Sequence, residues 1–141
     1  MHKISLVIPI YNEEFNINNL FDEILNTNVY KIVNTIIFID DCSKDQSLKL
    51  LKKIQQNYNK VHILTHTSNY GQSECLKSAA NYTSDKSIIT MDGDGQNNPK
   101  DIPKLLDKYL SNKDIYLVGG IRNKRKDNFI KILTSKIANK F

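Results

Sequence analysis

Two carboxylates stand two residues apart in the segment MDGDGQ, which spans residues 91–96. Asp92 and Asp94 repel each other, and each is followed by a glycine. Mg²⁺ and Mn²⁺ prefer oxygen ligands, and proteins often hold them with one or two carboxylates plus substrate phosphates. In extended backbone, residues i and i+2 project to the same side, and Gln96 adds a neutral oxygen. Taken alone, the spacing predicts either a divalent metal site, with glycines that leave room for a ligand, or an acidic turn before the next helix.

Several common phosphate and metal motifs are absent from the sequence. There is no G-x-G-x-x-G after the first apolar run and no G-x-x-x-x-G-K-[ST] anywhere, which argues against a dinucleotide oxidoreductase and a P-loop enzyme. A calcium loop that begins at Asp92 also fails, because Asn97 occupies its glycine position and Pro103 its bidentate glutamate position.

The elements that must position the acidic pair alternate along the chain. Asn12 and Ser43 are candidate caps for the first two helices. Strict alternation of strands and helices predicts an α/β fold, with a mainly parallel sheet and helices on both of its faces. Apolar runs predict strands at 3–10, 33–40, 60–66, 86–92 and 114–120, and helical spacing predicts helices at 13–26, 44–58, 71–82 and 99–110.

Polar and glycine residues follow every predicted strand. The five turns read PIYNEE, DDCS, SNYGQS, MDGDGQ and GGIR. Any one of them can be ordinary, since Asp41 or Ser43 is also a good helix cap. Ligands of open parallel sheets bind beyond the carboxyl ends of the strands. Five such turns on one edge therefore indicate a binding site.

The excess of positive charge is confined to the end of the chain. Residues 1–121 hold 13 lysines and 14 acids, a net charge of −1, whereas residues 122–141 hold five lysines, two arginines and one acid, a net charge of +6. Such a block is either a solvated helix face or a surface for an anion such as phosphate or lipid headgroups. Its lack of interleaved aromatic residues beyond Phe129 and Phe141 argues against nucleic-acid binding.

Length and cysteine content fit one domain in a reducing compartment. Cys42 and Cys75 show neither a disulfide framework nor a zinc spacing, so free thiols are expected. No secretory signal and no apolar run of membrane-spanning length is present. We expect a cytoplasmic chain, whose imperfectly amphipathic basic end either packs on the domain or meets the cytoplasmic face of a membrane.

These motifs together resemble the family 2 glycosyltransferases of GT-A fold, in the branch that loads a sugar onto polyprenyl or dolichyl phosphate. The matching blocks are VIPIYNEE, FIDDCSKD, NYGQS, TMDGDGQNNPKDIPKLL and VGGIRNKRKDNFIKILTSKIAN, in family order. The resemblance implies a nucleotide-sugar core over residues 1–121 and a basic segment, 122–141, that continues the same domain. It also implies that the chain ends within the family's catalytic domain, with much of the acceptor half absent.

The resemblance assigns a role to individual residues. Asp41 matches the aspartate that hydrogen-bonds the nucleotide base, Arg122 matches an arginine near the phosphates, and Lys131 falls where relatives usually have arginine. Asp94 and Arg122 are the implied catalytic residues, and Mg²⁺ or Mn²⁺ is the implied cofactor. The implied metal ligands are Asp92, Asp94 and Gln96, and the implied nucleotide-sugar contacts are Pro9, Tyr11, Glu13, Asp40, Asp41, Gln72, Asp92, Gly93, Arg122 and Lys131.

The implied reaction is inversion at the anomeric carbon, with a UDP- or GDP-linked sugar as donor and a polyprenyl phosphate as acceptor. A lipid phosphate is already anionic and needs no strong base, whereas a glycan hydroxyl acceptor does need one. His2, His62 and His66 are expected in packing or surface roles. Two alternatives stay open: a glycosyltransferase with a glycan hydroxyl acceptor, and a binding module without activity.

Overall fold

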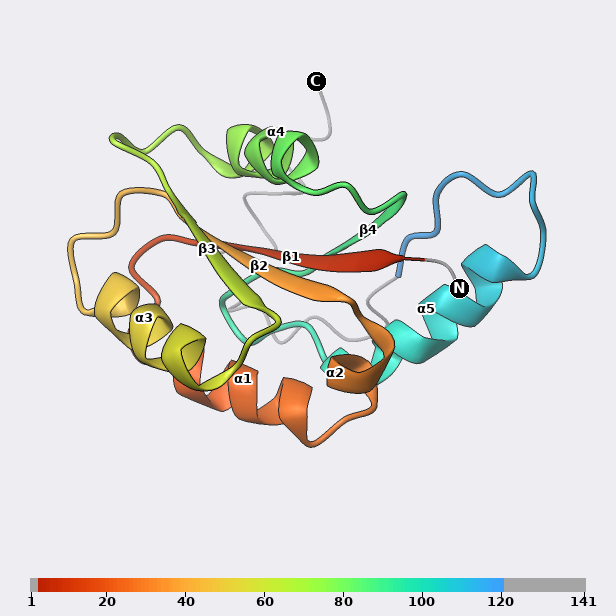
Figure 1. The fold of residues 1–141 in the computed structure, drawn as a ribbon, viewed down its shortest axis with the longest axis horizontal. Coiled ribbons are helices and arrows are strands. Elements are labelled where there is room, and N and C mark those ends of the chain that lie inside the picture. Colours follow the sequence, from red (N-terminus) through yellow and green to blue (C-terminus); the bar gives the residue numbers. More distant parts are fainter. Residues whose placement is uncertain (1–2, 121–141) are drawn as a thin grey trace, which may run out of the picture.

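The computed structural model describes residues 3–120, which form one parallel sheet covered by helices (Figure 1). The strand order is β3-β2-β1-β4, and each neighbouring pair is parallel. The predicted α/β class is confirmed. In chain order the elements are β1 (Ile4–Ile10), α1 (Ile17–Leu25), α2 (Val29–Ile32), β2 (Thr35–Asp40), α3 (Ser47–Asn57), β3 (Val61–Thr65), α4 (Gln72–Tyr82), β4 (Ser87–Thr90), the 3₁₀ turn η1 (Pro99–Asp101) and α5 (Ile102–Leu110).

Strand β1 lies inside the sheet, and its side chains pack into both layers of the core. Alternate side chains of a strand point to opposite faces. Leu6 and Ile8 therefore pack with buried residues of α1 and α3, while Val7 packs with Cys75 and Ala79 of α4. Figure 1 shows α4 on one face of the sheet and α1, α2 and α3 on the other. Burial on both faces explains why the strand reads as a continuous apolar run.

The register of the sheet aligns the strand ends that matter for binding. Ile10 is paired with Asp40, so the turns that begin at Tyr11 and Asp41 emerge side by side. β4 joins the other side of β1, and the bond from Met91 N–H to Val7 O (3.1 Å) continues that pairing one residue past the strand. The segment after β4 thus starts next to the end of β1.

The helix starts differ from the predicted ones. α1 begins at Ile17, after Asn16, and Asn12 has a left-handed φ of 55° in the preceding turn instead of capping it. α3 begins at Ser47, and Ser43 does not cap it. Phe15, which lies within the predicted helix 13–26, precedes α1 and is 85% exposed. The short helix α2 was not predicted at all.

The predicted strand at 114–120 is wrong. This segment forms no strand in the described part of the chain. Tyr116 and Leu117 are 89% and 88% exposed, so the apolar pattern that suggested a buried strand is not buried here. None of the helices within residues 3–120 is long and apolar enough to cross a membrane.

Gly93 is fixed by a close approach between the segment after β4 and the end of β1. A Cβ built at Gly93 would collide with the Ile10 Cδ1 atom and would lie 2.8 Å from Pro9 O. We expected the glycines of MDGDGQ to leave room for a ligand. In the structure, glycine is required at position 93 because the backbone there lies against the end of β1.

Gly93→Ala is therefore expected to destabilise the fold. Because the added methyl group meets backbone and a buried side chain, we expect the free energy of unfolding to fall by about 1–3 kcal/mol. Urea denaturation monitored by circular dichroism measures the change. Gly119→Ala is the matched control, because nothing lies within 4 Å of its Cβ position. Equal stabilities of the two variants would contradict the close-approach explanation.

Candidate functional site

A cavity of about 480 Å³ opens at the carboxyl ends of β1 and β2, beside the start of α4. It brings together residues from four predicted strand-end turns, which are far apart in the sequence. Eight of the predicted site residues line it: Pro9, Tyr11, Glu13, Asp41, Gln72, Asp92, Gly93 and Asp94. Four lining residues were not predicted: Ile10, Asn69, Gly71 and Cys75.

Asp41 is a buried carboxylate that accepts several hydrogen bonds. Its Oδ1 accepts from Tyr70 N–H (3.0 Å) and contacts His66 Nδ1 (2.7 Å), and its Oδ2 accepts from Gly71 N–H (2.7 Å). Burial by itself would raise the pKa of Asp41, but these hydrogen bonds outweigh it and lower the pKa below its ordinary value. Asp41 is therefore ionised at neutral pH.

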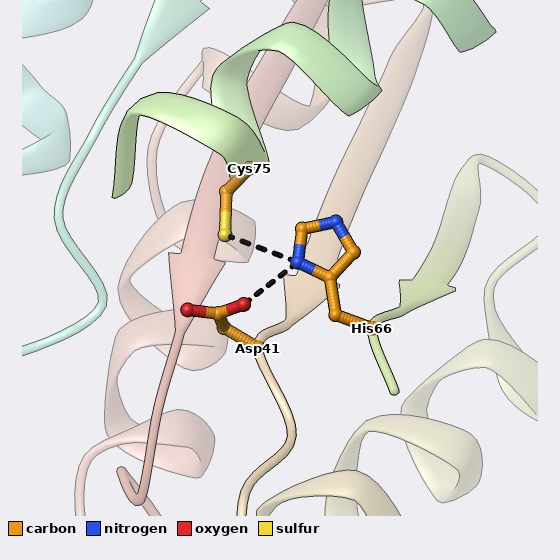
Figure 2. A group of neighbouring side chains, drawn as sticks. All are labelled: Asp41, His66 and Cys75. Carbon is orange, nitrogen blue, oxygen red and sulfur yellow. Dashed lines mark hydrogen bonds and ion pairs between the residues drawn. The ribbon is translucent and has the colours of Figure 1, made fainter. Parts of the chain in front are cut away.

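Asp41, His66 and Cys75 converge from three elements (Figure 2). They offer an oxygen, a nitrogen and a sulfur atom that all lie within 4.8 Å of one another, an arrangement able to hold a transition metal. Burial, and then the nearby Asp41 charge, raises the pKa of the free Cys75 thiol to about 11. Hydrogen bonding already accounts for two members of the cluster, because His66 Nδ1 lies 2.7 Å from Asp41 Oδ1. His66, expected in a packing or surface role, hydrogen-bonds the side chains of Asp41 and Ser78.

Asp92 and Asp94 both line the cavity, although Asp94 lies in a turn and not in extended backbone. Asp92 Oδ1 accepts from Gln72 Nε2 (3.0 Å) and its Oδ2 from Asn97 Nδ2 (3.0 Å). Asp94 Oδ1 accepts from Gln96 N–H (2.9 Å). The amide groups orient the carboxylates without neutralising them. Two carboxylates on one wall are a donor set that suits Mg²⁺ or Mn²⁺.

The remaining predicted residues lie elsewhere. Asp40 is 2% exposed and does not line this cavity, and its Oδ1 is a buried oxygen without a hydrogen-bond partner among the described residues. Gln96 lines a neighbouring cavity that it shares with Asp92. Arg122 and Lys131 lie outside the described residues.

The cavity wall carries negative charge. Among its lining residues, all within 3–120, four are acidic and none is lysine or arginine. An anionic ligand that enters it must be accompanied by positive charge, because carboxylates and phosphates repel each other at these distances. The four acids are Glu13, Asp41, Asp92 and Asp94.

Comparison with known protein families shows which family the chain belongs to. The model of glycosyl transferase family 2 matches residues 5–140. The chain belongs to this family. It is 34% identical over 142 residues to the undecaprenyl-phosphate 4-deoxy-4-formamido-L-arabinose transferase of Salmonella choleraesuis. The matched region covers 97% of this chain and 42% of that protein. The chain thus spans less than half the length of the curated relatives that it matches.

Solved structures agree on the fold of this family 2 chain. Glucosyl-3-phosphoglycerate synthase from Mycobacterium tuberculosis, in complex with uridine diphosphate, has a TM-score of 0.70 and 25% identity, over 88% of this chain and 46% of that one. A mannosyltransferase from Pyrobaculum calidifontis, in complex with GDP-Man and Mn²⁺, has a TM-score of 0.68 and 17% identity, over 79% of this chain and 33% of that one. The GT-A fold is confirmed.

The turn after β1 and the turn after β2 are joined by five hydrogen bonds that the sequence did not reveal. Both turns border the cavity of this glycosyltransferase chain, so their bonding fixes one of its walls. Asp45 belongs to this junction, and its other oxygen accepts from Ser47 N–H (2.9 Å) at the start of α3. The five bonds are Asn12 N–H to Ser43 Oγ (3.0 Å), Lys44 N–H to Asn12 Oδ1 (2.8 Å), Glu13 N–H to Ser47 Oγ (2.8 Å), Glu14 N–H to Asp45 Oδ2 (3.0 Å) and Gln46 N–H to Glu14 Oε2 (2.8 Å).

Asp45→Asn tests this junction through its pH dependence. Burial would raise the pKa of Asp45, but hydrogen bonds from Ser47 and Glu14 lower it below the ordinary value. A lowered folded-state pKa gives stability that is present above the unfolded-state pKa and is lost as the pH falls through the folded-state pKa. At pH 7 we expect the variant to lose about 1 kcal/mol of unfolding free energy, because its NH₂ group faces a backbone N–H.

The difference between wild type and Asp45→Asn should be smaller at pH 3 than at pH 7, because pH 3 lies below the ordinary aspartate pKa, where this stabilisation starts to be lost. Urea denaturation at both pH values measures it. Asp107→Asn, an exposed acid on α5, is the control and should match the wild type. The same loss for Asp45→Asn at both pH values would contradict the role of the ionised carboxylate.

Proposed function

We propose that this chain forms the donor half of a metal-dependent, inverting glycosyltransferase that moves a sugar from a nucleotide sugar to a polyprenyl phosphate. The observation that carries the proposal is the cavity in which four separate strand-end turns converge. Its residues lie at the edge of the sheet where open α/β folds bind their ligands. The nucleotide-sugar core corresponds to residues 1–121, and residues 122–141 continue the same domain.

Asp92 and Asp94 are the proposed holders of Mg²⁺ or Mn²⁺. Their carboxylates supply the hard oxygen ligands that these ions prefer. The described lining residues of the cavity include no lysine or arginine that could take the place of the ion. When bound, the ion neutralises the negative charge that develops on the departing nucleoside diphosphate. The Gln72 and Asn97 amides keep Asp92 in place for this role.

The proposed acceptor is a lipid phosphate. The named relative acts on undecaprenyl phosphate by its description, and an anionic phosphate oxygen attacks without a strong general base. Among the described residues, none of the lining side chains of the cavity is a histidine or a lysine that could serve as such a base. In this proposal Arg122 and Lys131 contact phosphate, and the basic segment 122–141 meets anionic lipid at the membrane surface.

Calorimetry tests the donor half directly. UDP-glucose, UDP-N-acetylglucosamine and GDP-mannose are titrated into the chain with and without Mn²⁺. We expect at least one of them to bind, and to bind more tightly with Mn²⁺. If no nucleotide sugar binds in a metal-dependent way, the proposed function is wrong.

Asp94→Ala is expected to remove the effect of Mn²⁺ on nucleotide-sugar affinity. Loss of a residue that only orients a metal ligand typically costs about 10–100-fold in metal affinity, so loss of a ligand itself should cost at least as much. The same titrations, with circular dichroism to check folding, measure it. Asp114→Ala is the matched control, since Asp114 is exposed and does not line the cavity. A Mn²⁺ effect that survives in Asp94→Ala would remove Asp94 from the metal site.

A further inference from the structure

The ends of β2 and β3 place an acid and an imidazole next to each other. Asp40 pairs with Thr65 in the parallel ladder of these strands. The residues that follow this pair, Asp41 and His66, therefore leave the sheet side by side. The backbone bond from His66 N–H to Asp40 O (2.9 Å) continues the pairing past the strands. As a result, Asp41 Oδ1 and His66 Nδ1 lie 2.7 Å apart.

Helix α4 adds a thiol to this pair. Cys75 lies near the start of α4, is buried, and hydrogen-bonds the Asp41 carboxylate. Its Sγ lies 3.9 Å from His66 Nδ1, and Figure 2 shows the three side chains pointing toward one another. The three potential ligand atoms all lie within 4.8 Å of one another. Three elements thus bring an oxygen, a nitrogen and a sulfur atom into one small volume.

The spacing of these atoms is close to that of ligands around one metal ion. In a tetrahedral zinc site, with metal–ligand bonds of about 2.0–2.3 Å, the ligand atoms lie about 3.3–3.6 Å apart. The oxygen and nitrogen atoms of this cluster are closer together than that, and the sulfur and nitrogen atoms are slightly farther apart. Side-chain movements of about 1 Å are therefore enough to reach tetrahedral spacing.

The imidazole and the carboxylate both have the outer partners that metal ligands usually have. A histidine that binds a metal through one ring nitrogen donates the N–H of the other nitrogen to an oxygen, which fixes its orientation. His66 Nε2 lies 2.9 Å from Ser78 Oγ, three residues after Cys75 and so on the same side of α4. The Asp41 carboxylate is held by the N–H groups of Tyr70 and Gly71.

We propose that Asp41, His66 and Cys75 form a binding site for a transition metal ion such as Zn²⁺. Thiolate and imidazole ligands favour such ions, whereas Mg²⁺ and Mn²⁺ prefer oxygen ligands. The site therefore differs in chemistry from the carboxylate pair of Asp92 and Asp94. The inference goes beyond the proposed function and does not depend on it.

The cavity gives an ion access to this site. Asp41 and Cys75 both line the cavity, whereas His66 does not line it and borders a separate hollow. The acidic wall attracts cations into the cavity. An ionised carboxylate and a thiolate together carry two negative charges, which match the charge of Zn²⁺. The His66 side chain is 11% exposed, so water competes little for its place in the site.

Binding of the ion replaces two protons that face the Asp41 carboxylate. Burial raises the pKa of the Cys75 thiol to about 11, but a thiol that coordinates a metal is deprotonated outright, and its proton leaves to water. In the neutral imidazole of His66, the ion takes Nδ1, and the ring proton then lies on Nε2, which donates to Ser78 Oγ. One proton is released for each ion bound, and nothing is oxidised or reduced.

Co²⁺ is the probe that reports a sulfur ligand. A thiolate bound to Co²⁺ gives a ligand-to-metal charge-transfer absorption in the near ultraviolet, which carboxylate ligands do not give. We expect this band when Co²⁺ is added to the chain in a thiol-free reductant, and we expect excess Zn²⁺ to abolish it by displacing Co²⁺. A wild-type chain that shows no such band would overturn the inference.

Cys75→Ala and Cys42→Ala form a matched pair of variants. Loss of a residue that only orients a ligand costs about 10–100-fold in metal affinity, so Cys75→Ala should weaken Zn²⁺ at least as much and lose the cobalt band. Cys42→Ala should keep both, because Cys42 Sγ contacts Thr67 O (3.6 Å) and is not part of the cluster. A band that survives in Cys75→Ala, or disappears in Cys42→Ala, would contradict the proposed ligand set.

His66→Ala keeps a test available if Cys75→Ala does not fold, which circular dichroism checks. This variant should weaken Zn²⁺ by about 10–100-fold or more. His62→Ala is its control and should match the wild type, because His62 Nδ1 contacts Tyr82 Oη (2.7 Å) and His62 lies outside the cluster. Equal Zn²⁺ affinities of the two histidine variants would overturn the inference.

Asp94→Ala separates this site from the proposed Mn²⁺ site. Asp94 is not part of the cluster, so the variant should keep the cobalt band while it loses the effect of Mn²⁺ on nucleotide-sugar affinity. Loss of the band in Asp94→Ala would contradict a separate site. If no nucleotide sugar binds with Mn²⁺ and the band is still present, the proposed function is wrong and the transition-metal site stands.

Discussion

The desolvation of Asp41 is the constraint on which the cavity depends. A buried carboxylate is costly unless hydrogen bonds replace its hydration. The replacements come from the segment after β3 and from the turn before α4, while Asp41 N–H bonds to Ile10 O (2.8 Å) at the end of β1. Gly71 reaches its place with a φ of +85°, which glycine adopts without strain. One ionised group thus ties three strand ends and one helix together.

The sequence predicted the fold well where an element's partners are encoded by its own pattern. β1 and β2 are continuous apolar runs because both of their faces are buried. The same pattern failed at 114–120. A strand forms only where a neighbouring strand takes its N–H and C=O groups, and Tyr116 and Leu117 lie exposed, without such a neighbour in the described chain. Apolar composition shows that a segment can be a strand, but it does not show whether a neighbouring strand is available to pair with it.

The sequence predicted which residues line the cavity better than it predicted the hydrogen bonds between them. Parallel strands end on one edge, so the residue types after each strand were enough to place Glu13, Asp41 and Asp92 in one cavity. The bonds between them depend on turn conformations that periodicity does not encode. Asn12 and Cys42 adopt positive φ values of 55° and 64°, which is uncommon for residues other than glycine. These turns create the contacts that the sequence did not reveal.

The carboxylates of the cavity differ in what balances their charge, and this difference separates their roles in the proposed function. Asp41 is balanced by donors of its own chain and has little acceptor capacity left. Asp92, next to Asp94, accepts hydrogen bonds from the amides of Gln72 and Asn97, which are neutral groups and bring no positive charge. A nucleoside diphosphate adds further negative charge to this wall. Two carboxylates and a diphosphate repel one another unless a divalent cation lies between them, so the cation and the diphosphate each make binding of the other more favourable.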